Sequence, residues 1–212
     1  MSVLVAVKHN NAVYFGADSQ VTFGGSRRSL SNPNNYKIWK VKGVDHCIMG
    51  SVGRCRDANV IRVMNNVVHE LDTLHDSIDF EWVVNCLVPH LFSELGERGF
   101  LDKDSNGQVS MNSSFLFGYK DRLFEISTDG CVIEIDDFDS IGSGSSQAVG
   151  SLLSTDGADP LTRIVCAIQA SVANDIYVDY PIVLCDTASD TFTIINKEDL
   201  EDGKNKNKHK GK

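Results

Sequence analysis

The sequence has few of the features that mark membrane, secreted or nucleic-acid-binding proteins. No apolar run approaches the roughly 18 residues of a membrane-spanning helix, and no signal peptide precedes the first apolar stretch. The chain carries 20 Lys and Arg against 29 Asp and Glu, a formal net charge of -9, so it lacks a basic footprint for nucleic acid or anionic lipid. We therefore expect a soluble, cytoplasmic protein that binds neither nucleic acid nor membrane.

Paired cysteines and metal-binding patterns are also scarce. The 6 cysteines form no C-x-x-C pair and lie in apolar runs, which is typical of thiols in a reducing compartment. The 6 histidines show no H-E-x-x-H spacing. Residues 102–107 resemble half of a calcium loop, but Ser113 stands where a bidentate Glu is needed, which favours a polar hairpin. We expect no metal and no cofactor, although the sequence leaves open whether residues 102–113 bind a cation.

Apolar periodicity indicates alternating groups of strands and helices. Residues 3–7 and 12–17 are apolar runs joined at residues 9–11, the pattern of a tight hairpin. Both faces of the first run are apolar, which favours a strand covered on both sides. Residues 19–35 are interpreted as a loop. Further strands are expected at 36–41, 47–53, 113–119, 122–127, 131–135, 182–186 and 192–195, and helices at 56–74, from 79, after 146, and at 160–176.

This order of elements predicts an α+β fold. Strands, two helices, strands, two helices and strands fit a four-layer αββα sandwich better than a parallel sheet. Two antiparallel sheets would pack face to face, with helices on both outer faces. We expect a single domain over residues 1–197, followed by a disordered lysine-rich tail at 198–212.

A first strand buried on both faces would hold the start of the chain rigidly and give residue 2 a chemical use. Ser2 is small enough to allow removal of Met1, which would leave a serine with both a hydroxyl and a free α-amine. That amine has an unperturbed pKa of about 7.7–8.0, so it can take the proton of the hydroxyl. Serine follows Met in many proteins, and Ser2 alone would indicate nothing.

Several strings in a fixed order resemble the proteasome β-subunit family of N-terminal-nucleophile hydrolases. The resemblance runs from Ser2 to about Ile195. Its strongest pieces are GADSQVT at 16–22, Lys37-Ile38, MGSVG at 49–53 and IGSGSS at 141–146. The GADSQVTFGG run is also similar to the bacterial two-component ATP-dependent peptidase and to bacterial proteasome homologues.

The resemblance implies a catalytic set around Ser2, which takes the place of the family's threonine nucleophile. Asp18 and Lys37 match the acid and lysine beside it, where the ammonium favours the ionised hydroxyl. Gly50 matches the residue whose backbone N–H stabilises the oxyanion.

The remaining implied residues hold the terminal amine and the substrate. Ser143 and Asp175 match the pair that hydrogen-bonds the amine. Thr22 would align an extended substrate by backbone pairing. The first specificity pocket is expected to be apolar and of modest width, with a lining of Val21, Ile48 and Val52.

The chain also departs from the family pattern. Serine lacks the methyl group that stiffens χ1 of threonine. Val178 stands where the family has a serine near the amine. There is no propeptide, so removal of Met1 would be the activating cut, and a retained Met1 would acylate the amine.

The function implied by the resemblance is that of an endopeptidase subunit of the threonine type, with serine as the nucleophile. It would act on peptides or unfolded proteins in a homo-oligomeric ring or ring-like assembly, with an ATP-dependent unfoldase as a further partner. Two alternatives stay open: a non-catalytic structural subunit that keeps Met1, and an N-terminal-nucleophile amidase acting on a small molecule. Residues 142–145 could cradle a phosphate, but they lack a P-loop lysine and are more simply a helix entry.

Overall fold

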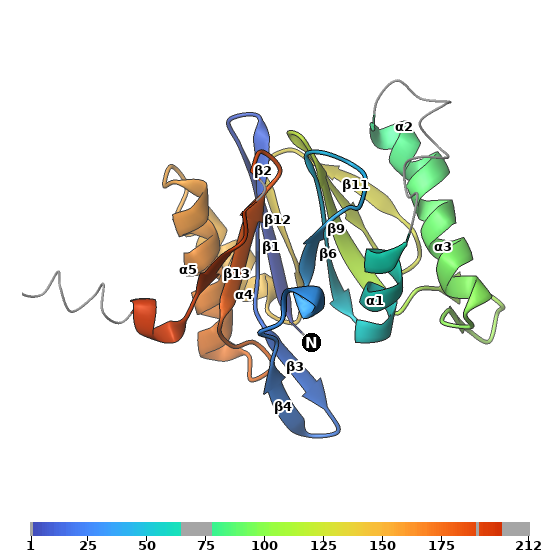
Figure 1. Ribbon diagram of the computed structural model, residues 1–212, viewed down its shortest axis with the longest axis horizontal. Helices are drawn as coiled ribbons and strands as arrows, with labels where there is room; N and C mark the ends of the chain where they lie inside the picture. The colour runs from blue at the N-terminus through green and yellow to red at the C-terminus, as the bar shows by residue number, and fades with distance from the viewer. Residues whose placement is uncertain (1, 65–77, 190, 201–212) are drawn as a thin grey trace, which may run out of the picture.

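Two antiparallel sheets packed against each other form the centre of the molecule (Figure 1). The computed structural model describes residues 2–64, 78–189 and 191–200. The first sheet has the order β12 (Phe138–Gly142), β1 (Val3–His9), β2 (Ala12–Ala17), β13 (Ile182–Asp186) and β14 (Thr193–Ile195). The second has the order β11 (Val132–Ile135), β10 (Arg122–Ile126), β9 (Ser113–Tyr119), β6 (Cys47–Gly53) and β5 (Ile38–Lys40).

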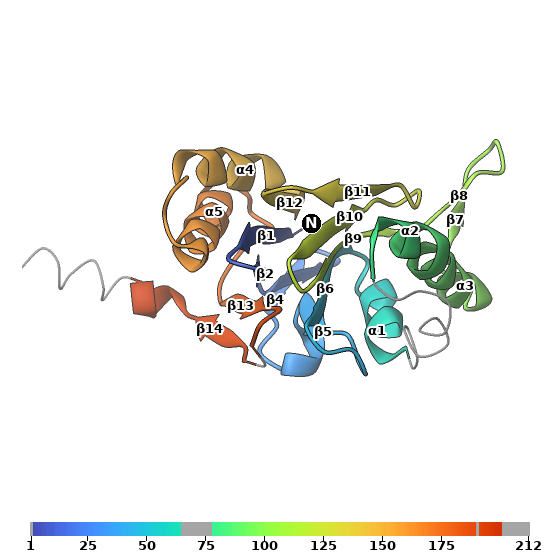
Figure 2. The same cartoon turned by 90° about the horizontal axis from the view of Figure 1, so that it is seen from above.

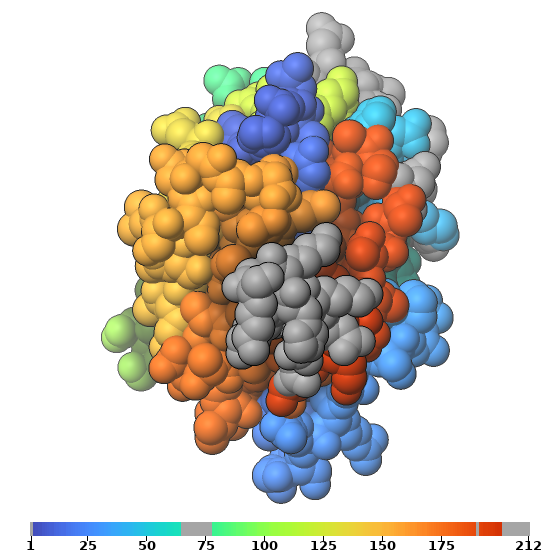
Figure 3. All heavy atoms as spheres, turned by 90° about the vertical axis from the view of Figure 1, so that its left-hand side faces the viewer, coloured from blue at the N-terminus to red at the C-terminus, as the bar shows by residue number. Residues whose placement is uncertain are grey.

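Helices cover the outer face of each sheet. The first sheet is covered by α4 (Ser145–Ser154) and α5 (Pro160–Asn174), which form the outer layer seen in Figure 3. The second is covered by α1 (Cys55–Val63), α2 (Phe80–Trp82), the π-helical segment η2 (Val83–Leu87) and α3 (Val88–Glu97). Figure 2 shows the four layers from above. The predicted αββα sandwich is therefore confirmed.

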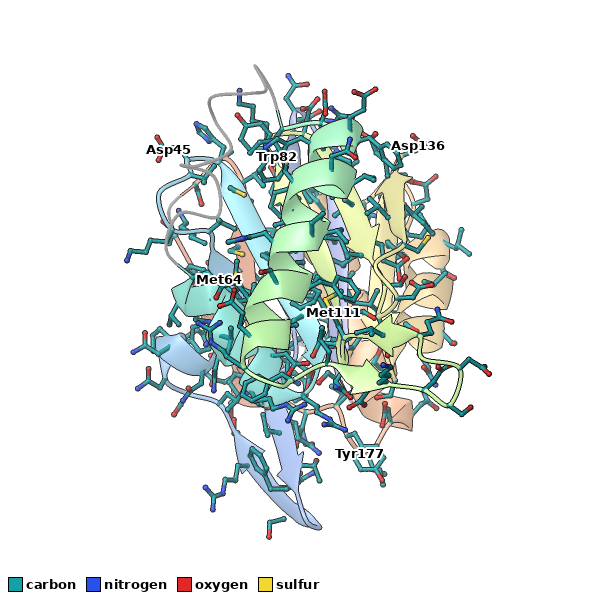
Figure 4. All side chains as sticks on the ribbon, turned by 90° about the vertical axis from the view of Figure 1, so that its right-hand side faces the viewer. Asp45, Met64, Trp82, Met111, Asp136 and Tyr177 are labelled. Carbon is teal, nitrogen blue, oxygen red and sulfur yellow. The ribbon has the colours of Figure 1, made fainter. Side chains whose placement is uncertain are left out.

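Three layers of apolar side chains hold the sandwich together. The central layer lies between the sheets and contains Leu4 and Phe15, both fully buried. The layer under α4 and α5 contains Val3 and Val5 from the opposite face of β1. Burial on both faces of β1 is what its unbroken apolar run predicted. Figure 4 shows the helix of α2, η2 and α3 crossing the second sheet, and Trp82 of α2 belongs to the third layer of apolar side chains.

The helices expected from residue 79 and at 160–176 each begin at an aspartate N-cap. Asp79 caps α2 by accepting a hydrogen bond from the Trp82 N–H at 2.9 Å. Asp159 caps α5 in the same way, accepting from the Thr162 N–H at 3.1 Å. In both cases a carboxylate satisfies a backbone donor that the first turn of a helix leaves free.

Some expected boundaries differ from the structure. The expected loop at 19–35 contains a hairpin of β3 (Gln20–Phe23) and β4 (Ser26–Ser29), followed by the short 3-10 helix η1 (Pro33–Asn35). Every residue of β4 is exposed, so no apolar alternation announces the strand. The edge strand β12 was likewise not expected, because its order depends on pairing with β1.

Two expectations extend beyond the described residues. The helix expected at 56–74 corresponds to α1 up to Val63, and its positions from residue 65 onward lie outside them. Residues 197–200 form a helical turn, so the start of the expected tail at 198 is ordered, and residues 201–212 lie outside the described part.

The stretch that resembles a calcium loop is a hairpin. It pairs β7 (Asp102–Lys103) with β8 (Val109–Ser110). The Asp104 carboxylate accepts hydrogen bonds from the backbone N–H groups of Asn106 and Gln108 at 2.9 and 2.8 Å. In the described residues, no group of three or more His, Cys, Asp or Glu side chains is placed to hold a metal ion. In the same part of the chain, no helix has the length and apolar character that crossing a membrane requires.

Two acidic side chains from different sheets, Glu125 and Asp139, interact electrostatically. Burial and the neighbouring Asp139 raise the pKa of Glu125, and burial also raises the pKa of Asp139. A raised folded-state pKa gives stability that is complete below the ordinary value of 4.5 and is lost as the pH rises through the folded value.

We therefore expect Glu125→Gln to stabilise the protein relative to wild type at pH 8, and not at pH 4.5. The amide mimics the protonated acid and removes the repulsion with Asp139. The gain should be about 1 kcal/mol or less, because the pair is partly exposed. Urea unfolding across this pH range measures the difference, and a difference that shrinks as the pH rises would contradict the raised pKa of Glu125.

Candidate active site

A buried carboxylate ties four segments together at one end of the sandwich. Asp18 follows β2 and is 1% exposed. Its Oδ1 accepts hydrogen bonds from the Lys37 Nζ at 2.6 Å and the Val3 N–H at 3.0 Å. Its Oδ2 accepts from the N–H groups of Gln20 at 3.0 Å and Asp179 at 3.4 Å. With a donor pair on each oxygen, the ionised carboxylate is fully satisfied.

Lys37 presents a buried amine beside this carboxylate. The residue directly precedes β5 and is 8% exposed. Burial lowers the pKa of the Lys37 amine, and the charge and hydrogen bond of Asp18 oppose that shift. Smaller contributions from Cys55 and Asp175 raise the pKa of Lys37, so both groups lie within its electrostatic reach. Lys37 is therefore held in one place, with a proton that it releases more easily than an exposed lysine does.

Ser2 is held at the end of β1 by the turn that follows β12. The Ser2 N–H donates to the Ser143 Oγ at 3.0 Å, and the Gly144 N–H donates to the Ser2 carbonyl at 3.2 Å. Gly142 has φ +107, and a Cβ there would lie 2.2 Å from the Ser2 carbonyl oxygen. Only glycine can make so close a turn. The structure thus fixes the main chain of Ser2, which is 5% exposed.

Asp175 lies directly after α5, and one of its oxygens has no partner. Its Oδ1 accepts from the Tyr177 N–H at 2.9 Å. Its Oδ2 is buried and without a hydrogen-bond partner in the described part of the chain. Val178, which replaces a serine of the family pattern, is 3% exposed and packs in the layer under α4 and α5. Buried carboxylate oxygens nearly always accept a hydrogen bond, so this oxygen is a site where a further donor can bind.

A cleft of about 420 Å³ opens beside Ser2 and Lys37. The hairpin β3–β4 forms one wall, and the predicted substrate residues Val21 and Thr22 both line it. One face of α1 forms another wall through Cys55, Ala58, Asn59 and Arg62, which follow helical spacing. Ser2 therefore lies at a cavity large enough to bind several atoms of a ligand.

Comparison with known proteins identifies the family of this chain. The family model described as "Proteasome subunit" matches residues 2–159, which is most of the chain. The chain belongs to the proteasome subunit family. No curated protein matches the sequence.

Solved structures similar to this proteasome-family chain share its fold at low sequence identity. BPH of Thiobacillus denitrificans in complex with epoxomicin is 18% identical with a TM-score of 0.67, covering 87% of this chain and 97% of its own. The eukaryotic HslV of Trypanosoma brucei is 20% identical with a TM-score of 0.60, covering 87% and 98%. The Anbu (Gly-1) mutant of Hyphomicrobium sp. strain MC1 is 15% identical with a TM-score of 0.65, covering 95% and 90%.

In this proteasome-family chain, three expected site positions on β6 face the core. Ile48 is 1% exposed in the layer between the sheets, and Val52 packs against the same layer. A Cβ on Gly50 would lie 2.7 Å from the Leu4 side chain. Alternate residues of a strand share a face, so these three positions lie on the side away from the cleft. Of the three residues expected to form an apolar pocket, Val21 is among the lining residues of this cleft, and Ile48 and Val52 are not.

The Gly50 N–H, which was expected to stabilise the oxyanion, is also directed away from the cleft. The Ser51 N–H donates to the Lys37 carbonyl at 2.9 Å, on the side of β5. Neighbouring residues of a strand direct their N–H groups to opposite sides. The Gly50 N–H is therefore directed toward β9, and the Gly53 N–H toward the side of β5. Gly53 lines the cleft, and the sequence did not single it out because the direction of its N–H depends on how β6 pairs with β5.

Proposed function

We propose that this chain is a cytoplasmic, proteasome-like peptidase subunit that hydrolyses peptide bonds with Ser2 as an N-terminal nucleophile, exposed by removal of Met1. The observation that carries the proposal is that Ser2 and the buried Lys37 line one cleft, with Asp18 beneath the lysine. Ser143 is already bonded to the nitrogen that would become the terminal amine. Family membership supports the same reaction class.

The proposed reaction begins with the free amine of Ser2 accepting the proton of its own hydroxyl. The Oγ then attacks the carbonyl carbon of the substrate, and the Lys37 ammonium stabilises the charge that develops on Oγ. When the C–N bond breaks, the amine returns the proton to the leaving nitrogen. A seryl ester remains, and water hydrolyses it with the amine again acting as base.

Two groups in the site would serve the new amine and the oxyanion. The Asp175 Oδ2 lacks a donor in the described structure, and a terminal ammonium would supply one. The Gly53 N–H, on the cleft side of β6, is our candidate for oxyanion stabilisation in place of Gly50. With Val178 in place of a serine, Ser143 and Asp175 would share the task of holding the amine.

The hairpin beside the cleft offers a place for an extended substrate. In the described residues β3 pairs only with β4, which leaves its other edge available. A peptide adding to that edge at Thr22 would bring a carbonyl toward Ser2 by backbone pairing alone. We propose peptides or unfolded proteins as substrates, a homo-oligomeric ring or ring-like assembly as the active form, and an ATP-dependent unfoldase as the partner that feeds it.

The identity of the first residue tests this proposal. We expect the intact mass of the purified native protein to lack Met1, and the protein to cleave fluorogenic peptides. Epoxomicin, which the Thiobacillus denitrificans protein binds, should inhibit that cleavage. A mass that includes Met1 would favour the structural subunit, because an acylated nitrogen cannot act as the base. Hydrolysis of small amides with every peptide inert would favour the amidase.

A further inference from the structure

In the part of the chain that the structure describes, the cleft beside Ser2 is lined by basic side chains and by no acidic one. Its cations are Arg28, Lys37, Arg54 and Arg62. Among the described residues no Asp or Glu lines it, although the chain has a net charge of -9 and an excess of acids. A cavity of one sign in a protein of the opposite sign attracts ligands of the complementary charge.

Two of these cations are already matched by acids. Lys37 is bonded to the buried Asp18 at 2.6 Å. Arg54 lies 3.7 Å from Asp102, in an exposed pair that contributes little. Arg28 and Arg62 make no ion pair with an acid of the described residues. The positive charge that remains for a ligand therefore comes from these two arginines.

Arg62 is the less exposed of the two, and it is incompletely bonded. Its guanidinium lies 4.9 Å from the Trp39 ring centroid, and its Nη2 donates to the Tyr36 carbonyl. Its Nε and Nη1 are buried and have no partner in the described part of the chain. Burial lowers the pKa of Arg62, with Cys55 opposing the shift. A desolvated cation costs free energy, and because Arg62 lines the cleft, a carboxylate bound there would offset part of that cost by pairing with its charge.

Arg62 lines the same cleft as Ser2, from the last turn of α1. Tyr36, whose carbonyl Arg62 contacts, directly precedes Lys37 in the chain. Cys55 and Arg62 begin and end the α1 face along the cleft, and seven residues of helix span about 10 Å. A basic substrate side chain here would meet like charge, and an apolar one would leave the guanidinium unpaired. An acidic side chain would avoid both the repulsion and the unpaired guanidinium.

We propose that this cleft selects substrates with an acidic side chain beside the scissile bond, and that Arg62 is the specificity-determining residue that pairs with it. The proposal rests on the peptidase function proposed above and adds the class of substrate. It replaces the apolar pocket expected from the sequence.

The test compares two peptides that differ only in charge. Matched fluorogenic peptides carry Glu or Gln at the cleaved position, and kcat/KM is measured for the mature wild-type protein. We expect Glu to be preferred about tenfold or more, the range of a hydrogen bond to a charged group. Arg62→Gln should bring the two peptides within about threefold, by slowing Glu and not Gln. Arg62→Lys, which keeps the charge, should retain a preference for Glu.

A matched control removes an arginine outside the cleft. Arg122 also lies over an aromatic ring, at 5.3 Å from the Phe124 centroid, and pairs with Glu134. Arg122→Gln should leave the Glu preference unchanged. If Arg62→Gln does not fold, the wild-type ratio and its value in Arg62→Lys decide the question.

The possible outcomes distinguish a failure of this proposal from a failure of the peptidase function on which it rests. Equal turnover of Glu and Gln peptides by an active wild-type protein overturns the acidic preference and leaves the peptidase function standing. A Glu preference that survives in Arg62→Gln overturns the role of Arg62. A mature protein with Ser2 at its N-terminus that cleaves no peptide of the panel overturns both.

Discussion

Replacing Ser2 with alanine should abolish peptide hydrolysis and leave the fold intact. The substitution removes the attacking Oγ but keeps the main-chain contacts to Ser143 and Gly144. Loss of a nucleophile in a coupled catalytic unit lowers kcat by about 10³-fold or more. Cleavage of the preferred peptide, measured beside thermal unfolding, checks both halves of the prediction.

Two further variants sharpen this result. Ser19 is another buried serine next to Asp18, and its Oγ has no hydrogen-bond partner in the described residues. Ser19→Ala should therefore retain activity, as a matched loss of one hydroxyl. Ser2→Thr should be as active as wild type or more so, because the extra methyl group restricts χ1. If Ser2→Ala kept its activity, Cys55, which lines the same cleft, would be the nucleophile to test next.

Replacing Asp18 with asparagine should unfold the protein more easily and inactivate it. The Lys37 ammonium would lose its only buried counter-charge among the described salt bridges, at a cost of about 3–5 kcal/mol. An asparagine amide would also turn an NH₂ group toward some of the donors that Asp18 accepts from. We expect the melting temperature to fall by roughly 10 °C. Thermal and urea unfolding measure the loss.

A double variant separates the effect of the unpaired buried charge on stability from the effect of altered packing. Asp18→Asn combined with Lys37→Met removes both buried charges, so stability should partly return while activity stays absent. Glu134→Gln breaks the half-buried pair with Arg122 and serves as the control, with an expected cost of about 1 kcal/mol or less. An Asp18→Asn protein as stable as wild type would show that the buried pair does not hold this end of the sandwich.

Local patterns were enough to predict most elements and part of the site. The apolar run of β1, the turn at residues 9–11 and the caps at Asp79 and Asp159 depend on neighbouring residues only. The same holds for the αββα order of elements. The Asp18–Lys37 pair was placed by resemblance to a family, and the structure brings the two side chains within 2.6 Å.

Other parts of the site could not be found in this way. Strand β4 is polar throughout, and its pairing with β3 is what forms the cleft wall. Whether Gly50 or Gly53 faces the cleft depends on the register of β6 against β5. A shift of one residue in that register reverses the side that each position faces. The partners of Arg62 lie on other elements. Trp39 lies in β5 and Tyr36 lies shortly before it, whereas Arg62 lies in α1.

The sequence by itself determined the periodicities, the helix starts and the residue types from which a hydrolytic site can be built. Only the tertiary structure decided which of these residues share a cavity and what charge that cavity carries. The physical reason is that apolar spacing and capping act within a few residues. Which side a strand residue faces, and which group pairs with a buried charge, depend instead on segments that come into contact only when the two sheets pack.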